Sequence, residues 1–415
     1  MSATPAMRPA AGAPRSRGLV PLYLTHAMVH LAIGLYPAVL IVLRTQFHVS
    51  YALLGGVFTA AMFVYGFGAL PVGLLLDRVS PLLLVRLSLA GFSFAVLAVA
   101  VAPNEIWFAV ALLLLGLACA PYHTAALTLV SRLSGNDPRL LGHHGMMGNL
   151  GLASAPLFGG LLAWAVSWRL AFAGASLLGF ALLLVLCTRM PTLPAEIGPD
   201  RHRRPADRSA ATDRTHLAAL VLVLAITAAL GFIYRGVATY LPALVAQRTD
   251  LPTGAALLGG GALASAIYFV GFFGQWWGGH LGGRRAVTWI YALLLAATAV
   301  LLAAAFTASG AALVCLLAVF SFVHFTTQPL DNVFTGRFTS HRRRGVGYGL
   351  SFGISFGLGS LAAWTCGLVA DAAGGRLQYV LLPLAGVAAV AALLAVALAV
   401  VARRSPGPTA RGAQP

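Results

Sequence analysis

The chain has little charge and no lysine. Only ten of its 415 residues are acidic, and charged residues make up 9% of the sequence, against roughly 25% in soluble domains. Without lysine there is no Schiff-base amine and no Gly-Lys-Ser/Thr loop for a nucleotide. The four cysteines have no metal-ligand spacing, and we predict neither a metal site nor a cofactor. These absences argue against a soluble enzyme and against a machine driven by bound ATP.

Long apolar runs occupy most of the chain. Apolar residues make up 59% of the sequence, in runs of about 20 or more, and such a run is long enough to cross a ~30 Å hydrocarbon core as a helix. We therefore predict an all-α integral membrane protein with twelve transmembrane helices, the first retained rather than cleaved as a signal peptide. The predicted helices cover residues 19–43, 51–76, 81–102, 105–132, 141–166, 168–189, 216–246, 252–281, 285–306, 309–336, 345–370 and 377–402.

The 27 basic residues are all arginine, and they gather on one side of the predicted bundle. On these boundaries 22 lie on the side of both termini, four on the other side (Arg44, Arg169, Arg248 and Arg376), and Arg235 inside a helix. The formal charge of +17 therefore follows the positive-inside rule and does not indicate a nucleic-acid partner. We expect both termini in the cytoplasm, with arginines touching anionic lipid headgroups.

The chain repeats itself with an offset of 205 residues. Pro37 corresponds to Pro242 and Arg132 to Arg337, with several glycine pairs between them. Six helices followed by six, joined by a polar loop, indicate a parallel internal repeat. We divide the chain into a tail (1–18), an N-terminal six-helix bundle (19–189), a cytoplasmic linker (190–215), a C-terminal six-helix bundle (216–402) and a second tail (403–415).

A Gly-x-x-x-Asp-Arg motif follows the second predicted helix, as Gly73, Asp77 and Arg78. It resembles the helix 2–3 loop signature of the major facilitator superfamily, and the resemblance extends over nearly the whole chain. The resemblance implies two pseudo-symmetric six-helix bundles and secondary transport by alternating access. It also implies a gate, in which we expect Asp77 and Arg78 to meet the cytoplasmic end of the eleventh helix near Arg342–Arg344.

In that family the first, fourth, seventh and tenth helices line a central cavity, and all four carry polar residues here. Ionisable groups inside a membrane are costly and indicate a functional site. The repeat makes His30 equivalent to Arg235, and His123 equivalent to Gln328. The alternative is that each polar residue is locally satisfied between packed helices. The predicted solute and proton cavity contains His26, His30, His123, Tyr234, Arg235, His324, Gln328 and Asp331.

Two expectations concern the edges of this cavity. Asp331 lies six residues before Arg337, so we expect it to pair with a group nearer the cytoplasm than Arg235. His143 and His144 open the fifth predicted helix, and we expect both to be solvated at its rim.

The fifth predicted helix is rich in glycine. Its residues 155–160 resemble the Gly-Pro-x-x-Gly-Gly signature of the exporter (antiporter) branch of the superfamily, with Ala155 in place of the first glycine. Small residues let two helices approach closely, which favours a sealed gate and export. Ordinary glycine packing is the alternative. The residues of this exporter-type motif are Gly148, Gly151, Ala155, Pro156, Gly159 and Gly160.

Residues 116–160 also resemble the fosmidomycin-resistance-like exporters, through Tyr122-His123, Arg132 and the segment from Gly148 to Pro156. His30 stands where that group has an acid. Leu112 replaces the arginine expected in drug exporters, which leaves histidines or Asp331 as candidate proton carriers.

The resemblance favours proton-coupled efflux of a small organic compound from a bacterial-type inner membrane, and Arg235 favours an anion. Proton-coupled uptake on the same fold stays open, as does a non-transporting membrane sensor. We expect a monomer whose partners are the solute, protons and membrane lipids.

Overall fold

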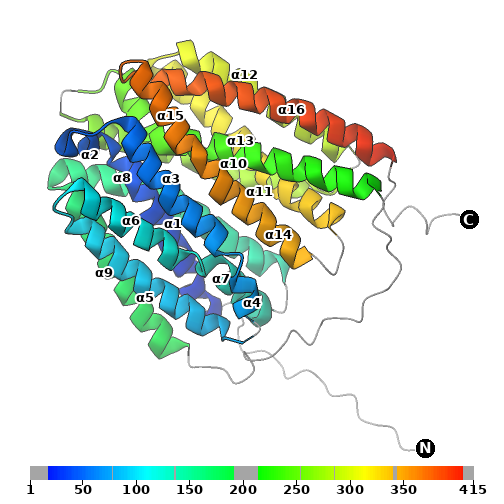
Figure 1. Cartoon of the computed structure of the whole chain (residues 1–415), viewed down its shortest axis with the longest axis horizontal. Coiled ribbons are helices and arrows are strands. Elements are labelled where there is room, and N and C mark those ends of the chain that lie inside the picture. Colours follow the sequence, from blue (N-terminus) through cyan, green and yellow to red (C-terminus); the bar gives the residue numbers. More distant parts are fainter. Residues whose placement is uncertain are drawn as a thin grey trace, which may run out of the picture.

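A computed structural model describes residues 17–76, 78–134, 137–190, 214–252, 254–284, 286–339 and 344–404. Within these ranges every regular element is a helix (Figure 1). The first half contains η1 (Arg17–Leu19), α1 (Val20–Ala38), α2 (Leu40–Phe47), α3 (Tyr51–Gly68), α4 (Val72–Leu75), α5 (Pro81–Ala100), α6 (Glu105–Cys119), α7 (Tyr122–Ser134), α8 (Pro138–Ala165) and α9 (Trp168–Arg189). The second half contains α10 (Arg214–Arg248), α11 (Ala256–Leu281), α12 (Val287–Thr307), α13 (Gly310–Phe338), α14 (Arg344–Phe352), η4 (Gly353–Gly357), η5 (Leu358–Ser360), α15 (Leu361–Ala372), η6 (Leu377–Val380) and α16 (Leu381–Arg404).

The prediction of a twelve-helix membrane fold is confirmed. Within the described ranges, eleven spans are long and apolar enough to cross a membrane, and the pair α1 and α2, bent by 50°, makes the twelfth when counted as one span. The chain also breaks between α3 and α4 at Pro71 and between α6 and α7 at Pro121. Proline interrupts a helix because it has no N–H to donate and its ring clashes with the carbonyl four residues earlier. The predicted linker falls between α9 and α10, where residues 191–213 lie outside the described ranges.

The eleventh predicted helix is not one continuous α-helix. After α14 the backbone forms a π-helical turn, η4, and then a 3₁₀ turn, η5, before α15 continues the span. The Ser360 hydroxyl donates to the Gly357 carbonyl at 2.5 Å, inside this break. Gly66 of α3 passes so close that a Cβ there would lie 2.4 Å from the Gly357 nitrogen. Such π-turns are often found at functional sites, and sequence periodicity could not detect this one.

The helices form two bundles, the N-terminal bundle (α1–α9) and the C-terminal bundle (α10–α16), which lie side by side (Figure 1). They meet along two seams, α3 against η4 and α15, and α8 against α11. We call the end where α1 begins and α16 ends the termini end, and the opposite end the far end. At the far end, the Asp371 carboxylate of α15 accepts hydrogen bonds from the Tyr51 and Ala52 backbone N–H groups of α3, at 3.0 and 2.8 Å.

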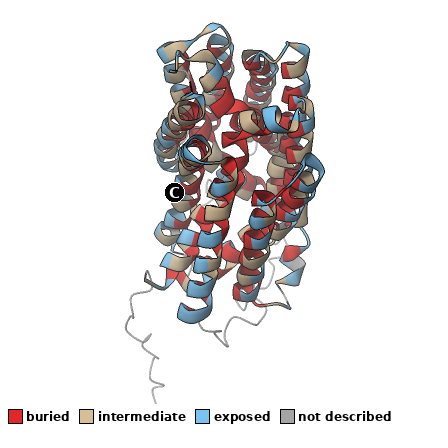
Figure 2. Ribbon diagram, turned by 90° about the vertical axis from the view of Figure 1, so that its left-hand side faces the viewer, coloured by how far each residue is buried: buried red, intermediate tan, exposed pale blue. Residues whose placement is uncertain are grey.

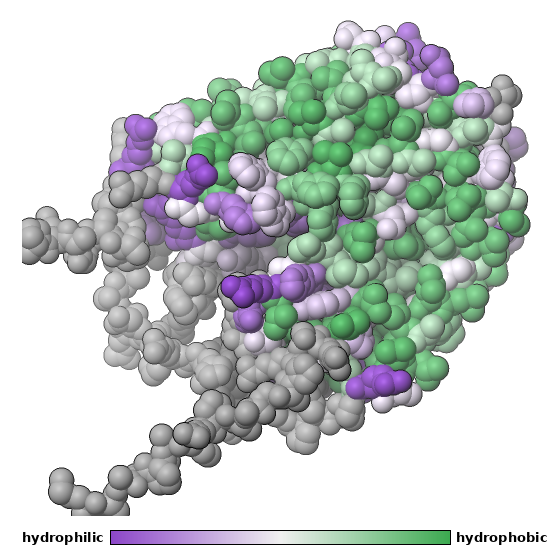
Figure 3. All heavy atoms as spheres, turned by 180° about the vertical axis from the view of Figure 1, so that it is seen from behind, coloured by the Kyte–Doolittle hydropathy of each residue, from purple (hydrophilic) through white to green (hydrophobic). Residues whose placement is uncertain are grey.

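The outer surface is apolar and the interior is tightly packed. Leu177, Leu293 and Leu393 are 70%, 70% and 71% exposed, although leucine normally lies inside a soluble protein. The view from behind shows a broad apolar surface over the middle of the molecule (Figure 3). Buried residues line the inner sides of the helices (Figure 2). This surface suits contact with lipid chains, so the chain is a multi-pass membrane protein.

Candidate functional site

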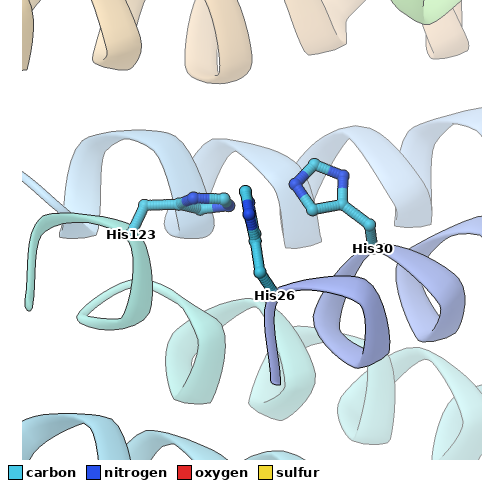
Figure 4. A group of neighbouring side chains, drawn as sticks. All are labelled: His26, His30 and His123. Atoms are coloured by element: carbon cyan, nitrogen blue, oxygen red, sulfur yellow. The ribbon is translucent and has the colours of Figure 1, made fainter. Parts of the chain in front are cut away.

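Three of the predicted cavity histidines lie together and form what we call the histidine cluster: His26, His30 and His123. Their ring centroids are 4.8 Å apart for His26 and His30, 5.1 Å for His26 and His123, and 5.2 Å for His30 and His123. The ring of His26 stands between the other two (Figure 4). One nitrogen from each ring lies within 4.8 Å of those of the others.

Local structure explains why these side chains meet. His26 and His30 are one turn apart on α1 and therefore share a face. His123 is the second residue of α7, just after the break at Pro121. The α8 helix packs behind the cluster at Gly148, where a Cβ would lie 2.7 Å from the His26 ring. Only glycine at position 148 leaves that ring in place.

A fourth histidine, His144, supports the cluster. Its ring stacks on His26 with a centroid distance of 4.1 Å, and its backbone carbonyl lies 2.6 Å from His26 Nδ1. His144 is only 3% exposed, so the expectation that it would be solvated was wrong, whereas His143 is exposed. Both residues open α8, but the helix turns only one of them toward α1.

Arg235 lies on α10 among aromatic rings. Its guanidinium carbon is 5.3 Å from the Phe58 ring centroid, 5.4 Å from that of Tyr234 and 5.7 Å from that of Phe356. The side chain is 4% exposed, and Nε has no hydrogen-bond partner among the described residues. A guanidinium is attracted by ring faces, yet these rings offer it no negative charge.

Arg235 and His30 line the same small cavity between the two bundles, which we call the arginine cavity. This agrees with their equivalence in the repeat. Its lining also includes Tyr234, Tyr268, Phe356 and Pro156. A second small cavity lies beside it inside the C-terminal bundle, and it is lined by Tyr234 and His324 among others. The rings of Tyr234 and His324 stack with centroids 6.1 Å apart.

The remaining polar residues of α13 lie elsewhere. Asp331 is buried within the C-terminal bundle, where its carboxylate accepts hydrogen bonds from the Thr227 hydroxyl at 2.8 and 2.9 Å and from the Tyr291 hydroxyl at 3.0 Å. It is not among the residues that line either cavity. Gln328 is half-buried and lines neither cavity.

The exporter-type motif of α8 uses two faces. Gly148, Gly151, Ala155 and Gly159 pack on α1 within the N-terminal bundle. Pro156 and Gly160 face α11 of the other bundle, where a Cβ on Gly160 would lie 2.4 Å from the Leu257 carbonyl oxygen. Pro156 interrupts the hydrogen bonds of α8, because proline has no N–H to donate. The N–H of the next residue, Leu157, donates to the Ser265 hydroxyl of α11 at 2.9 Å. The motif therefore both supports the histidine cluster and forms the seam.

The predicted gate cannot be placed in full. Gly73 in α4 and Arg78, three residues after that helix, are both exposed. Asp77, Arg342 and Arg343 lie outside the described residues, as does the side chain of Arg344. The gate therefore stays a prediction.

Sequence reasoning missed several groups at this site. Tyr65 and Phe356 cover the histidine cluster, with centroids 5.7 and 6.4 Å from that of His123. Tyr268 reaches the arginine cavity from α11. Aromatic residues are common in so apolar a chain, so no signal in the sequence separated these from ordinary packing residues.

Two six-helix bundles around a small buried cavity, with an arginine and a histidine on its wall, define a membrane transport protein. The model of the Major Facilitator Superfamily matches residues 22–363, and the chain belongs to that superfamily. It is a secondary transporter and not an enzyme.

Solved structures show the same fold. A bacterial homologue of the human lysosomal transporter Spinster, in an inward-facing, unoccupied conformation, aligns with a TM-score of 0.78 and 16% identity over 96% of this chain and 100% of that chain. The peptide transporter POT in complex with sulfate aligns with a TM-score of 0.77 and 16% identity over 96% and 97%. The nucleoside transporter NupG aligns with a TM-score of 0.74 and 15% identity, over 93% of this chain and 100% of that chain. No curated protein sequence matches the chain.

Proposed function

We propose that this transporter exports a small organic anion in exchange for protons. The observation that carries the proposal is Arg235, a buried cation on a cavity wall whose described neighbours are aromatic rings. An unpaired charge is expensive inside a membrane. A carboxylate or phosphonate of the solute supplies the missing negative charge, and the planar guanidinium binds such groups with two parallel hydrogen bonds.

Orientation supports export. The sequence assigns most arginines to the side of both termini, which favours a cytoplasmic position for that side by the positive-inside rule. The α8–α11 seam then closes the cavity toward the outside, where Gly160 and Gly261 allow close backbone approach. A seam of small residues can hold this closed state until the solute is bound.

We assign the proton to Asp331. Its carboxylate is buried among two hydroxyl groups, Thr227 and Tyr291, within the span α13. Ion-pair partners are absent from its described surroundings, so a bound proton removes the only charge there. Buried ionisable groups of this kind form proton relays in transporters.

The test is counterflow and gradient-driven flux in proteoliposomes with a panel of carboxylates, phosphonates and neutral analogues. Arg235→Lys keeps the charge but loses the planar fork of the guanidinium. In proteoliposomes that contain the transporter in the inside-out orientation, where export appears as uptake, it should weaken uptake of anionic solutes by about tenfold or more. Arg235→Gln should abolish anion transport and spare neutral analogues. Equal losses for both classes would overturn the anchor role, and flux in the opposite direction only would overturn export.

A further inference from the structure

The histidine cluster has the geometry of a three-ligand metal site. One nitrogen from each of His26, His30 and His123 lies within 4.8 Å of the others. A zinc ion with Zn–N bonds of ~2.0–2.1 Å places two tetrahedral nitrogens about 3.4 Å apart. Each nitrogen therefore has to move toward the centre by about 0.8 Å at most, which small ring rotations supply.

The hydrogen bonding of His26 fixes which nitrogen is free. The His144 carbonyl oxygen can only accept, so His26 Nδ1 must carry the proton in the 2.6 Å hydrogen bond. His26 Nε2 is then a bare lone pair, and it has no hydrogen-bond partner in the described part of the chain. His123 Nε2 is also buried without one. A backbone carbonyl behind a ligating histidine is the usual second-layer support of a metal site.

The support is rigid on the other sides too. His144 stacks on the His26 ring at 4.1 Å, and Gly148 of α8 leaves no room for a side chain behind it. Unsatisfied buried nitrogens cost free energy unless something pairs with them. Ordered water is the alternative occupant, since its two O–H groups can donate to both lone pairs, and the metal titration below separates the two occupants.

We propose that His26, His30 and His123 bind a divalent transition-metal ion of the zinc class. Imidazole nitrogen suits Zn²⁺, Co²⁺ and Ni²⁺, whereas Mg²⁺ and Ca²⁺ require oxygen ligands. Three protein ligands leave a coordination position open, as in sites where zinc binds a further small ligand.

The open position has a further consequence, which rests on the proposed function. His30 lines the arginine cavity with Arg235, so a metal on the cluster would lie beside that cation. Two cationic groups so close in a membrane require an anion between them. A solute carboxylate that meets both groups satisfies this requirement, so the solute class is an anion that can coordinate the metal.

The first experiment is direct metal binding by the purified full-length protein in lipid nanodiscs, prepared with a tag that contains no histidine. Titration with Co²⁺ should give visible absorption bands that saturate at one ion per chain and are displaced by Zn²⁺. His123→Gln should weaken Co²⁺ binding by at least about tenfold, since it removes a ligand. The matched control is His216→Gln, because His216 is another half-buried histidine within a span, on α10.

Gel filtration and thermal unfolding without metal separate a lost ligand from a lost fold. If His123→Gln unfolds, His30→Gln provides the same comparison from the other helix. Equal Co²⁺ affinity in parent, His123→Gln and His30→Gln would overturn the metal site, and so would the absence of bands in a folded parent protein.

The second experiment tests the shared anion. Malonate should shift the Co²⁺ bands of the parent, and Arg235→Gln should weaken the malonate effect by about tenfold while Co²⁺ binding itself persists. An unshifted parent spectrum would overturn the proposal that the anion binds the metal and Arg235 together. Because these measurements need no transport, they are separate from the flux assays that test the proposed function.

Discussion

The hydrogen bonds of Asp371 should hold the far end of the transporter closed. Tyr51 and Ala52 are the first two residues of α3, and their N–H groups have no partner within their own helix. Asp371 reaches them from α15 of the other bundle, at 3.0 and 2.8 Å. Ser50 caps the next N–H within the same bundle, at 3.1 Å from Leu53. The carboxylate therefore stabilises α3 only while the two bundles are together.

The size of the effect follows from these two bonds. A hydrogen bond to a charged group contributes about 1.5–3 kcal/mol, and a carboxylate at a helix N-terminus adds about 0.3–1 kcal/mol. Asp371→Asn keeps one neutral acceptor and loses the charge, so we expect the closed state to lose about 2 kcal/mol. This changes the closed-to-open ratio about 30-fold, which raises an open population of ~1% to roughly a quarter.

The assay is double electron–electron resonance in nanodiscs, with labels on Glu105→Cys and Ser309→Cys, which are exposed positions at the far ends of the two bundles. Asp371→Asn should add a long-distance component to the distribution. The matched control is Asp137→Asn, because Asp137 also caps a helix but within its own bundle, at 2.9 Å from the Arg139 nitrogen. Identical distributions for the parent and both variants would refute the reasoning.

Two further predictions use neighbouring residues. Gly55→Ala places a Cβ 2.1 Å from the Ala363 carbonyl oxygen, so it should push the bundles apart and lower the free energy of unfolding of the closed state by about 1–3 kcal/mol. Gly56→Ala is the control, because a Cβ there meets only Trp364, at 3.5 Å. Equal melting temperatures for the two variants would contradict this prediction. Asp331→Asn should abolish flux driven by a pH gradient and preserve solute exchange at equal pH in proteoliposomes, and gradient-driven flux that survives the change would remove Asp331 as the proton carrier.

Much of the fold could be predicted from the sequence, because hydrocarbon thickness sets the length of each apolar run. The breaks at Pro71 and Pro121 agree with the local chemistry of proline. The π-turn at Gly353–Gly357 could not be predicted from the sequence pattern, and it lies where α3 approaches closely at Gly66. Tertiary contacts of this kind leave no periodic signal in either helix.

The candidate site was partly predictable for a similar reason. The repeat placed His30 and Arg235 at equivalent depths, and both line one cavity. The repeat gives the depth of a residue along its helix, but it does not give the direction in which the side chain points around the helix axis. Asp331 and Gln328 therefore joined the predicted cavity, although Asp331 turns toward Thr227 and Tyr291 inside its own bundle.

The broken eleventh span connects the site to the seam between the bundles. Phe356 lies in the π-turn, 5.7 Å from the Arg235 guanidinium and 6.4 Å from the His123 ring centroid. Four residues later, the Thr59 hydroxyl donates a hydrogen bond to the Ser360 carbonyl of the other bundle at 2.6 Å, and Ser360 Oγ lies 3.2 Å from the Thr59 carbonyl oxygen. A solute that binds Arg235 must share the cavity with the Phe356 ring, and that ring is carried by the π-turn. Because a π-turn interrupts the regular hydrogen bonds of the helix, we expect this part of the seam to change its backbone conformation when the site is occupied.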